Sequence, residues 1–325
     1  MFSACQEKTA EINLYTHRHY EVDKQLFAAF EEQTGIKVNV TNASADELIE
    51  KMEIEGDQSP ADVLITVDAG RLVRAKEKEL LQTMTSEYLS NTIPAHLRDD
   101  DNQWFGLTKR ARVIAYSKER VHPDSLSTYE DLTSEKWKGK ILIRQSNNIY
   151  NQSLLASIIA HHGEEGAKEW VTGMMENFAR RPQGSDRDQV KAVMAGEGDL
   201  AIINTYYLGK LLKSSNPEEV AAGESVNIFF PNQEGRGAHV NISGAGVAKY
   251  SPNKENAIKF IEYLASKEVQ KVFAQANYEY PVHPEVAASD LLVSWGEFKS
   301  DVLPLTKLGE LNLNAVKTFN EAGWP

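Results

Sequence analysis

The chain has 325 residues, of which 41% are hydrophobic and 25% are charged, an ordinary composition for a globular protein long enough to form two lobes. Its formal net charge of −12 would repel phosphate backbones, so we expect no nucleic-acid partner. The longest apolar runs are far shorter than the ~20 residues that a membrane-spanning helix needs.

The single cysteine, Cys5, excludes an internal disulfide. It follows small residues in Met1-Phe-Ser-Ala-Cys5, a pattern similar to the end of a bacterial lipoprotein signal, in which the cysteine is acylated. We therefore expect residues 1–9 to be a signal remnant and tether that holds the protein at a membrane through Cys5. The alternative is a chance cysteine near the start of the chain.

The first part of the chain alternates between strand and helix patterns. Apolar periodicity predicts strands at 11–15 and 36–40, and a nearly all-apolar segment predicts an interior parallel strand at 60–66. The intervening helices each have one apolar face, and the first is expected to be capped by Asp23 and ended by Gly35. The predicted helices cover residues 23–34, 46–52 and 69–77. This β-α-β-α-β order is typical of a doubly wound lobe.

The middle of the chain predicts a second lobe of the same kind. A strand at 108–116 crosses into it, and a segment at 239–248 reads as a strand that returns. Between them we expect strands at 140–143, 200–203 and 226–230, and helices at 152–161, 164–175 and 188–194. Helices at 254–265 and 267–276 and a largely helical tail follow.

Two crossings imply a hinge of two strands with a cleft between the lobes. We expect an N-terminal lobe of residues 10–108 and 233–282, and a C-terminal lobe of residues 109–232 and 283–325. This α/β layout is typical of a bacterial solute-binding protein.

Three predicted loops leave the end of a strand and enter a helix, and they carry His19-Tyr20, Tyr150 and Tyr206-Tyr207. In a doubly wound fold such loops line one crevice, so these side chains are expected to meet. Phenolate is a hard anionic ligand that forms at neutral pH only where a strong Lewis acid displaces the proton. Ferric iron fits this donor set, whereas zinc prefers Cys and His, and calcium prefers many carboxylate and carbonyl oxygens.

Ferric iron bound by four phenolates and one neutral imidazole would carry one excess negative charge, which a nearby cation would balance. Arg110 on the crossing strand is the first candidate, and Arg112 faces the same way by strand alternation. Lys210 lies one helical turn after Tyr206 and is the third candidate.

Other interpretations of the same residues stay open at this point. Tyrosine is commonly a core residue with a satisfied hydroxyl group. His161-His162 is expected to be a solvated helix end, and Asp186 and Asp188 are expected to cap a helix. Mixed Tyr and His ligation of ferric iron also occurs in catechol-cleaving dioxygenases, and an aromatic cage could hold an organic cation, or the same fold an oxyanion.

With these residues in hand, the chain resembles the periplasmic ferric-iron-binding proteins of bacterial ABC importers, in particular the subgroup that binds iron through a His and four Tyr. The matching motifs span nearly the whole chain in the family's order. They are Leu14-Tyr-Thr-His-Arg-His-Tyr20, Pro60-Ala-Asp-Val63, Phe105-Gly-Leu107, Arg110-Ala-Arg-Val-Ile114, Asn148-Ile-Tyr-Asn-Gln152, Gly198-Asp-Leu-Ala-Ile-Ile-Asn-Thr-Tyr-Tyr207, Ser243-Gly-Ala-Gly-Val247 and Glu279-Tyr-Pro-Val282.

The resemblance implies a two-lobe periplasmic-binding-protein fold of type II, which is transferrin-like, and a receptor that is a monomer and not an enzyme. The receptor would capture Fe(III), free or chelated, and deliver it to an ABC permease in the inner membrane. The implied iron ligands are His19, Tyr20, Tyr150, Tyr206 and Tyr207.

The resemblance also implies a role for Arg110, either behind the ligands or in binding a carbonate-like anion. Four phenolates already nearly neutralise the metal, so an obligatory anion is not expected. His17 stands where relatives have a small residue, and it either competes as a ligand or fills the cleft.

Overall fold

The structure is a computed structural model that describes residues 10–18 and 20–325. Two residues that matter to the sequence predictions, Cys5 and His19, lie outside the described residues.

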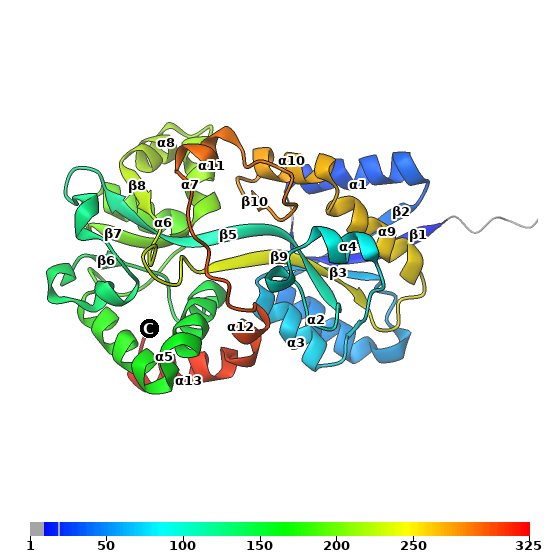
Figure 1. The fold of residues 1–325 in the computed structure, drawn as a ribbon, viewed down its shortest axis with the longest axis horizontal. Coiled ribbons are helices and arrows are strands. Elements are labelled where there is room, and N and C mark those ends of the chain that lie inside the picture. Colours follow the sequence, from blue (N-terminus) through cyan, green and yellow to red (C-terminus); the bar gives the residue numbers. More distant parts are fainter. Residues whose placement is uncertain (1–9, 19) are drawn as a thin grey trace, which may run out of the picture.

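Two long strands connect the lobes, as the sequence predicts (Figure 1). These are β5 (Trp104–Ser117) and β9 (Val240–Ala248), which pair antiparallel with each other. The second half of β5 then pairs with β7 (Leu200–Asn204) and β8 (Val226–Phe229). The main path through the sheet runs β2-β1-β3-β9-β5-β7-β6, so one curled sheet passes through both lobes.

The first lobe is built on a parallel group of three strands. Strand β1 (Glu11–Thr16) lies between β2 (Lys37–Asn42) and β3 (Val63–Val67), and β3 pairs antiparallel with β9 on its other side. The remaining elements of this lobe are α1 (Glu21–Thr34), α2 (Ala45–Glu55), α3 (Ala69–Glu77), β4 (Leu81–Gln82), α4 (Glu87–Thr92), α9 (Lys254–Leu264), α10 (Lys267–Ala276) and β10 (Tyr280–Pro281).

The apolar face of helix α1 packs against helix α9 in the core of this lobe. Phe27 and Phe30 pack edge-on against Phe260 of α9, with ring centroids 5.5 and 5.0 Å apart. The helix ends at Gly35, whose φ of 70° a residue without Cβ adopts freely. The prediction that Asp23 caps the helix is wrong. The helix begins at Glu21. Asp23 lies buried in its first turn, where its carboxylate pairs with the buried guanidinium of Arg18.

The second lobe places helices around β6 (Ile141–Leu142) and β7, which are parallel. Its elements are α5 (Ile149–Glu176), α6 (Asp186–Met194), α7 (Thr205–Leu212) and α8 (Pro217–Glu224). One prediction needs correction here, because Tyr150 lies in the first turn of α5 instead of in a loop. The two helices expected on either side of residue 163 are confirmed, since α5 is interrupted at Gly163, whose φ of 72° and ψ of 177° are not helical.

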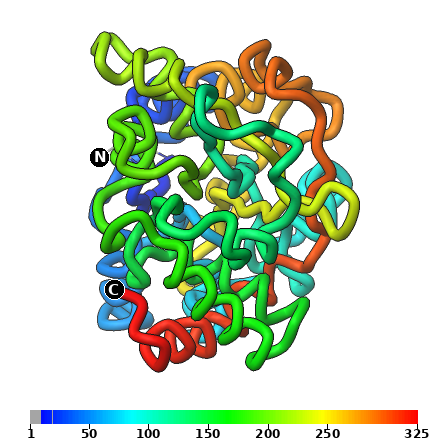
Figure 2. Tube along the Cα trace, turned by 90° about the vertical axis from the view of Figure 1, so that its left-hand side faces the viewer, coloured from blue at the N-terminus to red at the C-terminus, as the bar shows by residue number. Residues whose placement is uncertain are grey.

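The C-terminal segment contains α11 (Asp290–Ser294), α12 (Thr306–Glu310) and α13 (Asn312–Ala322). Helix α12 packs against both α3 and α5, and α13 lies along α5 (Figure 2). None of the helices in the described part of the chain is long and apolar enough to cross a membrane.

One buried histidine beside the crossing strands makes stability depend on pH. Burial, together with the guanidinium groups of Arg112 and Arg110, lowers the pKa of His239 from 6.5 to about 3. Between these values the unfolded chain binds a proton at this residue and the folded protein does not. Stability should therefore fall as pH falls through this window, by ~1.4 kcal/mol for each pH unit.

Replacing His239 with Leu should remove the pH dependence that this residue gives to the unfolding free energy. The difference in unfolding free energy between variant and wild type should shift in favour of the variant by about 2 kcal/mol between pH 7.5 and pH 5. Urea titrations of both proteins at the two pH values measure the shift. A difference that stays constant would contradict the prediction.

Candidate metal site between the lobes

Three phenols of the second lobe meet at the first turns of two helices. Tyr206 and Tyr207 open α7 directly after β7, and Tyr150 lies in the first turn of α5. The Tyr206 hydroxyl donates a hydrogen bond to the Tyr150 hydroxyl at 3.2 Å, and the rings of Tyr206 and Tyr207 lie 4.3 Å apart. The structure therefore brings together residues that are 56 positions apart, as the predicted crevice requires.

The position of α7 follows from local sequence. All five residues of β7 are buried, and Asn204 in extended conformation ends the strand and stands at the N-cap. Its side chain makes no capping bond, and its backbone N–H donates to Asp186 Oδ2 at 2.7 Å. This bond anchors the strand-to-helix junction that carries the two tyrosines.

The fourth phenol comes from the first lobe. Tyr20 stands at the N-cap of α1, with the Arg18 guanidinium 5.1 Å from its ring centroid. Lys210 of α7 reaches across to it: the ammonium nitrogen lies 3.6 Å from the centroid of Tyr20 and 5.3 Å from that of Tyr206. Tyr20, Tyr150, Tyr206 and Tyr207 are called the phenol cluster below. His19, the expected fifth donor, lies outside the described residues.

Three guanidinium groups surround the ring of Tyr150. Arg110, Arg112 and Arg144 lie 5.4, 5.9 and 5.7 Å from its centroid. Arg110 and Arg112 thus face the same side of β5, as strand alternation predicts. Sequence reasoning missed Arg144, because it follows a two-residue strand and belongs to no periodic pattern.

Buried carboxylates hold these arginines. Arg110 pairs with Asp68 at 3.6 Å. Asp186 accepts hydrogen bonds from Arg112 at 2.6 Å and from Arg144 at 3.4 Å. The prediction that Asp186 is a capping residue is therefore wrong.

The cap of α6 is a reciprocal bond pair between Ser185 and Asp188, as expected for Asp188, which leaves the Asp186 carboxylate for the arginines. The exposed pair His161 and His162 takes no part in the cluster, since their rings contact the carboxylates of Asp301 and Glu130 at 2.7 and 2.8 Å.

Burial raises the pKa of Tyr20, Tyr206 and Tyr207 and so makes these phenols harder to ionise. It raises the pKa of Tyr20 to about 12 and that of Tyr206 well above 10, and neighbouring phenols raise the pKa of Tyr206 further. The pKa of Tyr207 is raised for the same reasons. Burial also lowers the pKa of Lys210 to about 8. Phenols in this state become ligands only where a cation of high charge density displaces their protons.

The donor chemistry of the cluster is distinct from that of common metal sites. Within residues 10–18 and 20–325, no group of three or more His, Cys, Asp or Glu side chains could hold a metal ion. The cluster instead gathers phenol oxygens, which are hard donors that suit a trivalent cation. The guanidinium groups of Arg110, Arg112 and Arg144 lie around the ring of Tyr150.

Two lobes joined by two crossing strands, with polar side chains of both lobes converging where they meet, define a two-lobe binding protein of the type II class. Residues 58–298 match the family of bacterial extracellular solute-binding proteins, and the chain belongs to this family. It is therefore a binding protein and not an enzyme, so the dioxygenase alternative is rejected.

Several relatives whose names refer to iron match this chain over almost its whole length. Iron uptake protein A1 of Synechocystis is 54% identical over 97% of this chain and 87% of its own length. The major ferric iron-binding protein of Neisseria meningitidis serogroup B is 28% identical over 99% of this chain and 95% of its own. A Trichodesmium protein (IdiA, FutA), solved in complex with iron and citrate ligands, is 53% identical, covers 97% of this chain and 100% of its own, and superposes with a TM-score of 0.95.

Proposed function

We propose that this chain is the ferric-iron receptor of a bacterial ABC importer and captures Fe(III) between its two lobes. The observation that carries the proposal is the convergence of buried and partly buried phenols, with the Tyr150 and Tyr206 hydroxyls 3.2 Å apart. Relatives that are named for iron uptake or ferric iron binding support it.

The proposed ligands are the phenolates of the phenol cluster together with the imidazole of His19. Each phenol would release its proton as iron binds, because the metal stabilises the anion far more than the buried site does. Arg110, Arg112 and Lys210 would compensate the excess negative charge. Their placement around Tyr150 and Tyr20 supports this role.

The iron could arrive free or as a chelate, and the citrate in the Trichodesmium structure supports a carboxylate chelate as one form. Carbonate or another small anion is not required for charge balance in this proposal. Should one bind, Arg110 is the natural contact, because its two terminal nitrogens are buried and find no hydrogen-bond partner among the described residues.

Iron would also act as the bridge that closes the protein. We assign residues 10–108 and 233–282 to the first lobe, and 109–232 and 283–325 to the second. Tyr20 then comes from the first lobe and the other three phenols from the second, so a metal bound to all of them favours the closed form.

The closed form would dock, as a monomer, on a permease in the inner membrane from the periplasmic side, tethered through an acylated Cys5. Reduction to the ferrous ion, which binds four anionic oxygens less tightly, or acid, which returns protons to the ligands, would release the iron.

Metal analysis of the purified protein tests the proposal. Protein incubated with ferric citrate and then desalted should retain about one iron per chain and show the visible phenolate-to-iron absorption. A protein that retains no iron but binds a quaternary ammonium ion or an oxyanion would instead support the organic-cation or oxyanion alternative for this fold.

A further inference from the structure

Helix α7 turns one face toward the first lobe. Tyr206, Gly209 and Lys210 are spaced by three and four positions and so share this face. Lys210 defines its direction, since its ammonium nitrogen lies over the ring of Tyr20. The glycine is unexpected there, because Gly inside a helix is less stable than Ala by ~1 kcal/mol.

The space beside Gly209 is filled by a residue of the first lobe. A Cβ atom on Gly209 would lie 2.6 Å from both Cβ and Cγ of Tyr278. Tyr278 stands between α10 and β10 and has a φ of 56°, a value that non-glycine residues seldom adopt. Because Cβ is bonded directly to Cα, rotating the Tyr278 side chain moves Cγ but leaves the contact with Cβ in place.

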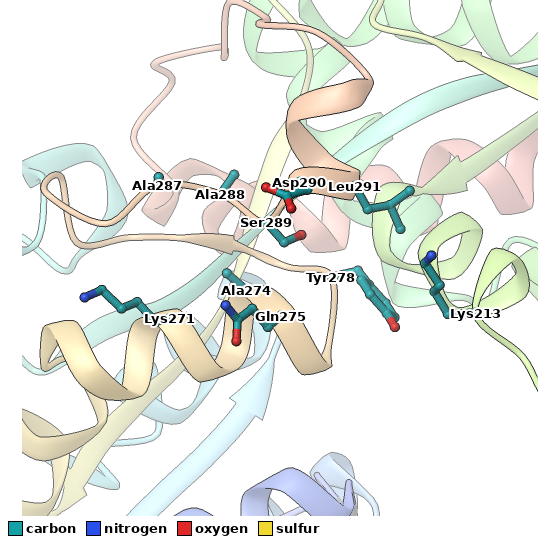
Figure 3. Close-up of a pocket in the computed structure, with 10 residues that line it drawn as sticks. All are labelled: Lys213, Lys271, Ala274, Gln275, Tyr278, Ala287, Ala288, Ser289, Asp290 and Leu291. Atoms are coloured by element: carbon teal, nitrogen blue, oxygen red, sulfur yellow. The ribbon is translucent and has the colours of Figure 1, made fainter.

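The outer side of Tyr278 faces a solvent-filled groove of about 610 Å³. Figure 3 shows its ring between Lys213 at the end of α7 and Gln275 of α10, at the point where the two lobes approach each other. Tyr278 therefore lies between α7 on one side and solvent on the other.

We propose that Tyr278 seated on Gly209 is the stop that sets how closely the first lobe approaches α7. Through this contact it positions Tyr20 relative to Tyr206 and Tyr207. The inference rests on the proposed function, because it concerns the geometry in which the two lobes share one iron. A side chain on α7 at this position would hold the lobes apart and lengthen the span that the metal must bridge.

Replacing Gly209 with Ala tests the stop. Ala favours the helix, so the iron-free variant should be at least as stable to heat as the wild type. Its affinity for ferric iron should nevertheless fall at least ~10-fold, or about 1.4 kcal/mol. The double variant G209A/Y278G removes both Tyr278 atoms that the new methyl group would meet, and glycine adopts the φ of 56° freely, so it should recover most of the lost affinity.

Competition with citrate, followed by the phenolate-to-iron absorption, measures the affinity of each protein. Small-angle scattering of the iron-loaded proteins should show a larger radius of gyration for Gly209→Ala than for the wild type. Lys213→Ala, at the C-cap of the same helix and lining the groove, is the matched control and should bind iron as the wild type does.

The proposal is overturned if Gly209→Ala binds iron as tightly as the wild type, or if the double variant stays as weak as the single one. A wild-type protein that binds no iron would remove the proposed function and this inference together. Unchanged iron binding by Gly209→Ala, or a double variant as weak as the single one, would overturn this inference and leave the proposed function standing.

Discussion

Replacing Tyr206 with Phe should weaken ferric-iron binding at least ~100-fold and strongly reduce the visible absorption of the iron-loaded protein. The loss should exceed the 10–100-fold that is typical of residues which only support metal ligands, because the change removes a proposed ligand itself. Phe fills the same buried space, so the fold should be retained. The variant also removes the hydrogen bond that the Tyr206 hydroxyl donates to Tyr150.

The control is Tyr250→Phe, which removes a hydroxyl group from a ring that is 49% exposed, outside the phenol cluster. It should bind iron with unchanged affinity and colour. If the Tyr206 variant does the same, this tyrosine is not a ligand, although the chain could still bind iron through other residues of the cluster.

Replacing Asp186 with Ala should destabilise the protein by about 3–5 kcal/mol, because it leaves two arginines without their buried carboxylate. Asp186 is fully buried and bonds Arg112, Arg144 and the backbone N–H of Asn204. Its loss therefore affects both the core and the junction that carries the tyrosine pair. Urea unfolding of the iron-free protein gives the change in free energy.

Asp188→Ala is a matched control two residues away on the same helix. It removes one half of a capping box at the surface and should cost only ~1 kcal/mol. A loss for Asp186→Ala no larger than for Asp188→Ala would show that the arginines find other partners.

Local patterns in the sequence were enough to predict most of the fold. The crossing strand, the apolar strand that ends at Asn204 and the helix that ends at Gly35 are all governed by neighbours in the chain. The same patterns placed Tyr206 and Tyr207 at a strand-to-helix junction. That placement, together with doubly wound topology, was sufficient to predict that Tyr150 would join them.

Residues whose role depends on distant partners could not be predicted in this way. Asp23 and Asp186 were expected to be caps, because an acidic residue near the start of a helix usually is one. Both instead neutralise buried arginines. Arg144 and Tyr278 gave no signal, since their partners Asp186 and Gly209 are far from them in sequence.

Strand β5 has a consequence for how the molecule holds together. It is one continuous strand of 14 residues whose first half pairs with β9 and whose second half pairs with β7 and β8. Disrupting it in either half exposes the backbone polar groups of sheet strands on both sides, at a high energetic cost. We therefore expect the two lobes to depend on each other for stability and to unfold on heating in a single cooperative transition.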